Sequence, residues 1–367
     1  MPAMLIALIA ATLIALLAGQ ALPKAFEAAP AFWAHIALAM GVMTLITAAM
    51  QHFVPVLCRS RGTGTWMARL PLLMLAAGAL AVAALGGWVD FLWVSAAALL
   101  ALAGMVVMVA WMLDKARQAL GRPHPGLYWY VAAMACLGLA LAAAMMIPLF
   151  PDWHDELRAF HLHLNLYGFV GLTAVGTLQV LMPTAAGQAD PQAGLRLDRD
   201  LKWAMAGALG IAYGQAAWPV LTWLGVALWA WVLGRMGWAW WRLHRVRMLS
   251  LHGAEPVLAA SLLGYAAALI GVLQGHENPL GQFLPAFLMP LVTGAAGVLA
   301  PVWLNPTRPA AHAAGRLVLN RWGAVRALLF LVAAVLPLLG FQCAGMPALT
   351  ALAWFGIVFG VWLYRQD

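Results

Sequence analysis

Charged residues are scarce in this sequence. Only 9% of its 367 residues are Asp, Glu, Lys or Arg, whereas soluble domains carry about 25%. The length alone would fit two soluble domains, but so few charges cannot cover their surfaces with polar groups. With 65% hydrophobic residues, the composition instead predicts a protein that lies largely within lipid.

Cysteine is scarce as well. Cys58, Cys136 and Cys343 each stand alone in or beside an apolar run, and no CxxC pair is present. This argues against a thiolate metal site and against a disulfide framework, and we interpret the three as small apolar packing residues. Short segments of alternating hydrophobicity are also missing, which argues against a transmembrane β-barrel.

Long apolar runs, by contrast, recur from one end of the chain to the other. Runs of 18 or more residues can cross a hydrocarbon core about 30 Å thick as helices. The sequence therefore predicts an all-α, polytopic membrane protein with a single membrane domain over residues 1–367. The first run lacks the basic segment of a signal peptide and is kept as a membrane helix. The twelve predicted spans are 4–22, 31–57, 67–87, 89–113, 127–149, 157–183, 201–217, 219–241, 256–274, 281–304, 321–341 and 346–364.

The basic residues alternate along these spans. Of the 20 Lys and Arg residues, only Lys24 and Arg158 lie in loops after odd-numbered spans. Cytoplasmic loops carry the Lys/Arg excess, so both termini are predicted to be cytoplasmic, in a bacterial-type inner membrane. The net charge of +8 then reflects the basic cytoplasmic loops of a protein in a lipid bilayer, and no nucleic-acid partner is expected.

Two of the predicted spans share a pattern of polar residues. Each has a histidine 20 residues before a proline, and a glutamine four residues before the same proline. The members are His35, Gln51 and Pro55 in the first span, and His163, Gln179 and Pro183 in the second.

Span 281–304 ends in a similar way at Pro301, but it has Gly281 at the position of the histidine. These three spans are spaced by four. The sequence thus predicts three four-helix repeats, over residues 1–122, 123–250 and 251–367, as internal repeats are common in membrane folds.

Three histidines fall at one depth near the outer side: His35, His161 and His163. Ionisable residues within membrane spans are costly and indicate a functional site, and imidazole is the commonest metal ligand. His161 and His163 are two residues apart on a helix and point about 200° apart. They would therefore bind at two sites on opposite faces of the helix, or one would be a ligand while the other faces a loop. The alternative is that all three are packed, hydrogen-bonded side chains. Asn165 and Tyr167 lie one turn below and are predicted to support a ligand or a neighbouring helix.

The stretch FHLHLNLYGFVGLTAVGTLQVLMP, residues 160–183, resembles the haem-ligating and copper-ligating helices of the haem–copper oxidase subunit I superfamily. The likeness is closest to cbb3-type oxidases and nitric oxide reductases, and the NnrS-type haem proteins share the histidine-to-proline pattern. AHIALAMGVM, which begins at residue 34, resembles the second helix of the superfamily. The resemblance implies that His35 is an axial ligand of haem b. It implies that His163 is a haem or copper ligand and that His161 is its companion.

The sequence also departs from this family. Span 281–304 has no histidine, although in the family the matching helix ligates both haems, and span 201–217 lacks the paired histidines of the copper site. These departures argue against an oxygen-reducing binuclear centre and indicate a degenerate, stand-alone relative.

We therefore expect a haem-binding membrane protein in which His35 and His163 hold one haem b, with copper at His161. Its role would be oxidoreductase-like: electron transfer or the handling of nitric oxide or oxygen, with a c-type cytochrome or respiratory subunit as partner. Two alternatives remain open at this stage. One is a copper transporter on the same scaffold, and the other is an assembly partner of respiratory complexes whose histidines only pack.

Overall fold

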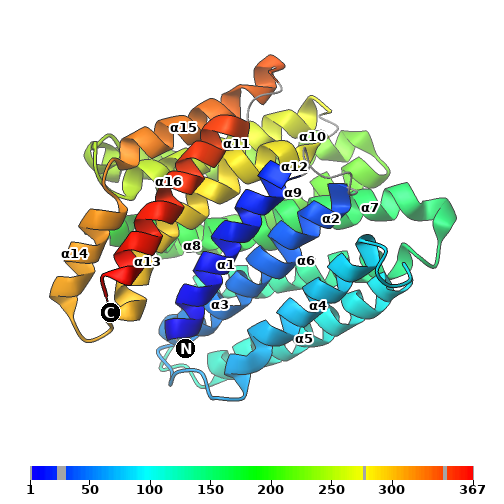
Figure 1. Ribbon diagram of the computed structural model, residues 1–367, viewed down its shortest axis with the longest axis horizontal. Coiled ribbons are helices and arrows are strands. Elements are labelled where there is room, and N and C mark those ends of the chain that lie inside the picture. The colour runs from blue at the N-terminus through cyan, green and yellow to red at the C-terminus, as the bar shows by residue number, and fades with distance from the viewer. Residues whose placement is uncertain (1, 23–29, 276–277, 342–344, 367) are drawn as a thin grey trace. The chain divides into compact units, whose positions relative to one another are not determined.

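The computed structural model describes residues 2–22, 30–275, 278–341 and 345–366, and all regular structure in these ranges is helical (Figure 1). Lys24 and Cys343 lie outside the described residues. The first half of the chain forms α1 (Pro2–Ala21), α2 (Pro30–His35), η2 (Ile36–Met43), α3 (Thr44–Leu57), η3 (Met67–Arg69), α4 (Leu70–Leu85), α5 (Trp93–Arg117), α6 (Gly126–Met146), η4 (Pro151–Trp153), α7 (His154–His163), η5 (Leu164–Val170) and α8 (Gly171–Ala186). The second half forms α9 (Ala193–Ala216), α10 (Pro219–Met248), α11 (Glu255–Leu273), α12 (Pro279–Phe283), η6 (Leu284–Leu288), α13 (Met289–Leu304), α14 (Pro309–Leu319), α15 (Gly323–Val335), η7 (Pro337–Leu339) and α16 (Gly345–Tyr364).

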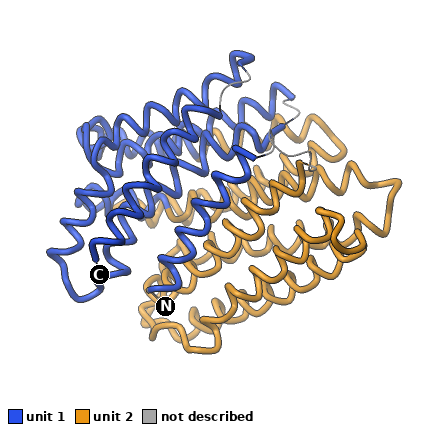
Figure 2. Tube along the Cα trace, in the orientation of Figure 1, with its two compact units in different colours: residues 1–22, 178–190, 233–367 blue, residues 23–177, 191–232 orange. Residues whose placement is uncertain are grey.

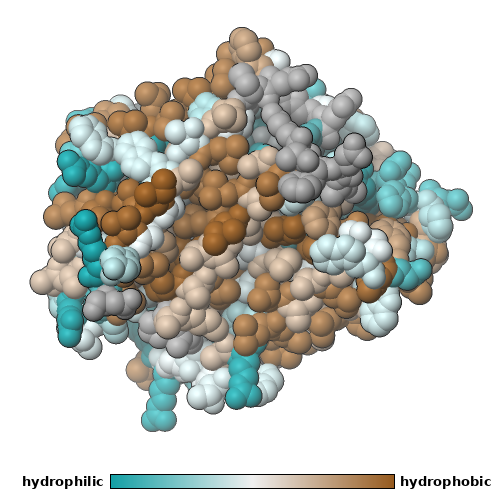
Figure 3. Space-filling view, viewed as in Figure 1, coloured by the Kyte–Doolittle hydropathy of each residue, from teal (hydrophilic) through white to brown (hydrophobic). Residues whose placement is uncertain are grey.

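The chain is an all-helical, multi-pass membrane protein. Ten of the described helical segments are long and apolar enough to cross a membrane, or eleven if the bent pair Pro309–Leu319 and Gly323–Leu339 is one span. Hydrophobic side chains predominate on the face that Figure 3 shows, as expected for a surface in contact with lipid.

The predicted number of twelve spans is not confirmed, although each predicted span falls on a helix. The segment at 201–217 belongs to α9, which is not among the ten. α9 begins at Ala193, and the chain from Arg196 to Lys202 holds five charged residues. This leaves an apolar stretch shorter than the roughly 20 residues that a spanning helix needs.

The chain divides into two compact units, which are coloured separately in Figure 2. The first comprises residues 1–22, 178–190 and 233–367, and the second comprises 23–177 and 191–232. In the first unit, α11 packs against α13, α15 and η6, and α1 packs against α13 and α16. In the second unit, α4 packs against η2 and α5, while α6 packs against α5, α7 and η5. All three candidate histidines lie in the second unit.

The prolines inside α3 and α13 each release a backbone carbonyl group. Proline lacks an N–H, so the carbonyl four residues earlier loses its helical donor. Before Pro55 this carbonyl belongs to Gln51, and the Thr63 hydroxyl donates to it at 2.6 Å. Before Pro301 it belongs to Gly297, and the Asn320 side-chain amide donates to it at 2.9 Å. Side chains from later loops therefore make these prolines tolerable within a buried helix.

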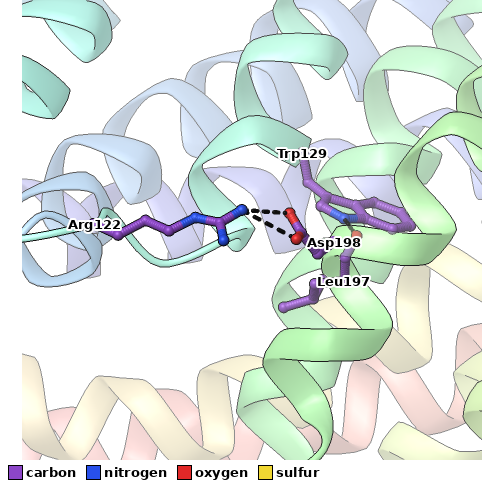
Figure 4. Close-up of polar contacts among 4 residues, drawn as sticks. All are labelled: Arg122, Trp129, Leu197 and Asp198. Carbon is purple, nitrogen blue, oxygen red and sulfur yellow. Dashed lines mark hydrogen bonds and ion pairs between the residues drawn. The ribbon is translucent and has the colours of Figure 1, made fainter.

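Two contacts join the start of α6 to α9 (Figure 4). The indole Nε1 of Trp129, which is fully buried, donates to the carbonyl of Leu197 at 2.9 Å. Arg122 in the preceding loop forms an ion pair with Asp198 at 3.1 Å. Because this ion pair is exposed, it contributes at most about 1 kcal/mol, and the buried indole contact is the more specific attachment.

His124 supports the start of α6 and gives a prediction about pH. Its Nδ1 accepts the Gly126 N–H at 3.1 Å, and partial burial lowers the pKa of His124 below its ordinary value. As the pH falls, the unfolded chain therefore takes up the proton first, so this contribution to stability is full above about pH 6.5 and is lost below it. Solvent screens the half-buried ring, so we expect a loss of less than ~1 kcal/mol.

Thermal unfolding in detergent at pH 7.5 and pH 5.5 would measure this effect. His124→Asn keeps an acceptor at the same position but does not titrate, and its melting temperature should fall less on acidification. Equal acid-induced shifts in both proteins would contradict the role of His124.

Candidate functional site

Three helical segments of the chain change from α to π geometry. They are η2 (Ile36–Met43), η5 (Leu164–Val170) and η6 (Leu284–Leu288). The first two begin directly after His35 and His163, the two histidines that stand 20 residues before a proline. Short π segments inside α-helices occur frequently at functional sites, so this region is the first place to look for one.

The structure brings together His35 of α2 and His161 of α7. Their ring centres are 6.2 Å apart and their planes differ by only 5°. Nitrogen–metal bonds of imidazole are about 2.0–2.1 Å long in zinc sites. Two imidazoles that bind one metal from opposite sides would therefore have ring centres roughly 6 Å apart. The spacing of the two ring centres matches this value.

Hydrogen bonds fix the tautomer of both rings. Nδ1 of His35 donates to the carbonyl of Ala31 at 2.7 Å, and Nδ1 of His161 donates to the carbonyl of Ala140 in α6 at 2.8 Å. Since a carbonyl can only accept, Nδ1 carries the proton in each ring. Nε2 is then the nitrogen with an available lone pair, as in histidines whose other ring N–H is held by a carbonyl while they ligate a metal.

Asn165 holds the ring of His161 from a second direction. Its amide nitrogen donates to the backbone carbonyl of His161 at 2.8 Å and lies 3.3 Å from Nδ1 and 3.4 Å from Nε2 of the same ring. Nδ1 already donates to Ala140, and a position in the ring plane equidistant from both nitrogens would collide with Cε1. The amide therefore lies over the face of the imidazole and restricts its rotation.

His163 is placed differently from the other two histidines. Its Nδ1 donates to the carbonyl of Ala159 at 2.9 Å, and its ring lies parallel to that of Tyr167 with centres 6.3 Å apart. Only 7% of its surface is exposed. The sequence-based interpretation joined His35 to His163, whereas the structure joins His35 to His161 and sets His163 beside Tyr167.

A site with three or more protein ligands is absent from the described residues. No group of three His, Cys, Asp or Glu side chains in those ranges could hold a metal ion. Two imidazoles are a donor set for a metal that needs only two ligands from the protein, such as haem iron, whose other four ligands are porphyrin nitrogens. The donor set of two Nδ1-protonated imidazoles fits such an iron.

One signal for this site could have been read from the sequence. Residues 31–35 read AFWAH and residues 159–163 read AFHLH. The repeat around His35 and His163 therefore includes the alanine four residues earlier, whose carbonyl accepts from Nδ1 of the histidine. Trp33 stands where the second segment has His161. The cross-helix acceptor Ala140 has no such signal, because any backbone carbonyl could serve.

Two buried residues were not singled out by sequence reasoning. His244 lies among basic residues near the end of α10, but only 1% of its surface is exposed. Arg326 lies near the start of α15 and is also 1% exposed. In both cases the charge pattern located the end of a span but could not show which side chains turn inward.

No protein-family model, curated protein or solved structure matches this chain. The resemblance to the haem–copper oxidase superfamily therefore depends on the motifs alone and stays a prediction.

Proposed function

We propose that this protein binds one haem b through His35 and His161 and transfers electrons within a membrane. The observation that carries the proposal is the parallel pair of imidazoles with ring centres 6.2 Å apart. They come from segments far apart in the sequence, and each has its Nδ1 bound to a carbonyl. Packing alone does not require this combination of spacing, plane and tautomer.

The two-histidine arrangement supports electron transfer over the binding or reduction of oxygen or nitric oxide. Haem iron can change between two oxidation states, and its axial ligands set its potential. If His35 and His161 both held the iron of a haem, no ligand position would remain for oxygen or nitric oxide. Of the roles that the resemblance implies, electron transfer therefore has the most support, and an oxygen-reducing centre has the least.

The proposal extends to the orientation of the protein. The alternation of basic loops supports cytoplasmic termini in a bacterial-type inner membrane. The histidine pair would then lie near the outer side, where a c-type cytochrome or another respiratory subunit could exchange electrons with it. The twelve-span count and the three repeats belong to the same proposal. The three π segments in spans two, six and ten support the repeats.

Absorption spectra of the detergent-solubilised protein, oxidised and then reduced with dithionite, test the proposal. We expect a Soret band and sharp α and β bands on reduction, as for six-coordinate, low-spin haem, with one haem per chain by pyridine haemochrome assay. Protein expressed with a supply of haem precursor that nevertheless lacks a Soret band would contradict the proposal.

Copper is a second candidate, because two imidazoles are also a ligand set for a copper ion. Elemental analysis of the same sample separates the two cases. Iron equal to haem, with no copper, supports the haem protein. Bound copper without haem would instead favour the copper transporter.

Asn165 gives a prediction about the environment of the proposed ligand. Asn165→Leu removes the amide that lies over the His161 ring but keeps a side chain of similar size. Loss of a residue that orients a ligand weakens metal binding roughly 10- to 100-fold, so we expect lower haem retention and altered g-values in the electron paramagnetic resonance spectrum. Tyr167→Phe, beside His163, is the matched control and should leave that spectrum unchanged. Identical g-values in Asn165→Leu and the wild type would contradict the orienting role.

A further inference from the structure

A second polar site lies in the other compact unit, at the joint between α14 and α15. The two helices are bent by 49° at a break of a few residues. Asn320 and Trp322 form this break, and Trp322 has a left-handed backbone with φ of 60°. The Trp322 N–H donates to Nδ1 of His252 at 3.0 Å, so the loop before α11 holds the joint in place.

Arg326 lies one turn into α15, directly beyond this joint. One of its nitrogens, Nη2, donates to the carbonyl of Leu319 at 2.9 Å, which satisfies the end of α14. The guanidinium lies 4.8 Å from the ring centre of Phe355, which is fully buried. The side chain is thus held from two sides.

The rest of the guanidinium has no partner. Nε and Nη1 of Arg326 are buried and make no hydrogen bond to any described residue, and no described carboxylate forms an ion pair with it. Oδ1 of Asn320, at the same joint, is also buried without a donor. A buried charge that is left uncompensated is strongly unfavourable, and arginine remains charged in proteins.

We propose that Arg326 binds a phosphate group, supplied either by inorganic phosphate or by a phospholipid headgroup. A phosphate oxygen can accept from several N–H groups of one guanidinium and neutralise it at the same time. The sequence of this unit has an excess of positive charge, with nine arginines and four acidic residues. The arginines are Arg235, Arg242, Arg245, Arg247, Arg308, Arg316, Arg321, Arg326 and Arg365.

Thermal unfolding of lipid-depleted protein in detergent tests the inorganic source. At constant ionic strength, the melting temperature of the wild type should rise by about 2–8 °C as phosphate replaces chloride, because a ligand that binds only the folded state stabilises it. Arg326→Met should show no rise. Arg321→Met removes an exposed arginine from the same joint and is the control, which should behave as the wild type.

Native mass spectrometry after reconstitution in phosphatidylglycerol vesicles tests the lipid source. If the headgroup supplies the phosphate, the wild type and Arg321→Met retain one more phospholipid than Arg326→Met. If the wild type retains no additional lipid and its melting temperature does not depend on phosphate, the proposal is overturned.

The stability of Arg326→Met without phosphate or lipid gives a separate criterion. Removal of an uncompensated charge should leave the protein at least as stable as the wild type under these conditions. A variant that fails to fold, or melts well below the wild type there, would show that the guanidinium is already satisfied within the protein, and it would also overturn the proposal.

Discussion

Replacement of His161 with alanine is expected to abolish the low-spin haem spectrum that we propose for this protein. The change removes one of the two parallel imidazoles and leaves His35 as the single proposed ligand from the protein. We expect the same loss for His35→Ala, and each variant should yield protein with little or no haem after purification. Absorption spectra and haem content per chain measure the effect.

His163→Ala is the matched control for this pair. His163 is two residues from His161, but its ring lies beside Tyr167, whereas the ring of His161 lies beside His35. The spectrum of His163→Ala should therefore keep the wild-type Soret band. If His163→Ala loses haem while His161→Ala retains it, the assignment of the axial pair is wrong, although a haem protein would remain.

The largest expected effect on stability comes from Gly264→Ala in α11. A Cβ at Gly264 would overlap the carbonyl carbon and oxygen of Ala286 and would lie 3.2 Å from the Phe287 nitrogen. These are backbone atoms of η6, so no side chain can move aside. We expect destabilisation of about 3 kcal/mol or more, measured as a lower melting temperature or as loss of folded protein in size-exclusion chromatography.

Gly356→Ala in α16 controls for the change of residue type. Apart from its chain neighbours and the backbone of its own helix, no atom of the described residues lies within 4 Å of a Cβ at this position, and alanine favours a helix over glycine by roughly 0.5–1 kcal/mol. This variant should be as stable as the wild type or slightly more stable. If Gly264→Ala behaved like Gly356→Ala, α11 and η6 would not approach as closely as described.

Most of the helical architecture could be predicted from the sequence. Each predicted span falls on a helix because an apolar run long enough for the bilayer has to satisfy its backbone hydrogen bonds internally. The prediction was less accurate where charge interrupts the pattern. α9 begins before its predicted span, among charged residues, and α14 forms a helix where a loop was expected.

The sequence also located the region of the candidate site but could not assign its partners. The spacing of His161 and His163 requires them to point in different directions on a helix. Nothing in that spacing says which of them meets His35. The choice depends on Ala140, whose carbonyl comes from a neighbouring helix, and on Asn165, whose amide lies over one ring and not the other.

The sequence by itself determined that this is a helical membrane protein with histidines inside its spans, because the cost of leaving water decides which residues can lie in lipid. Only the tertiary structure decided that His35 pairs with His161, that Thr63 and Asn320 satisfy the carbonyls freed by prolines, and that Arg326 is buried. Such contacts join residues far apart in the chain, and their geometry depends on how helices pack rather than on any local preference.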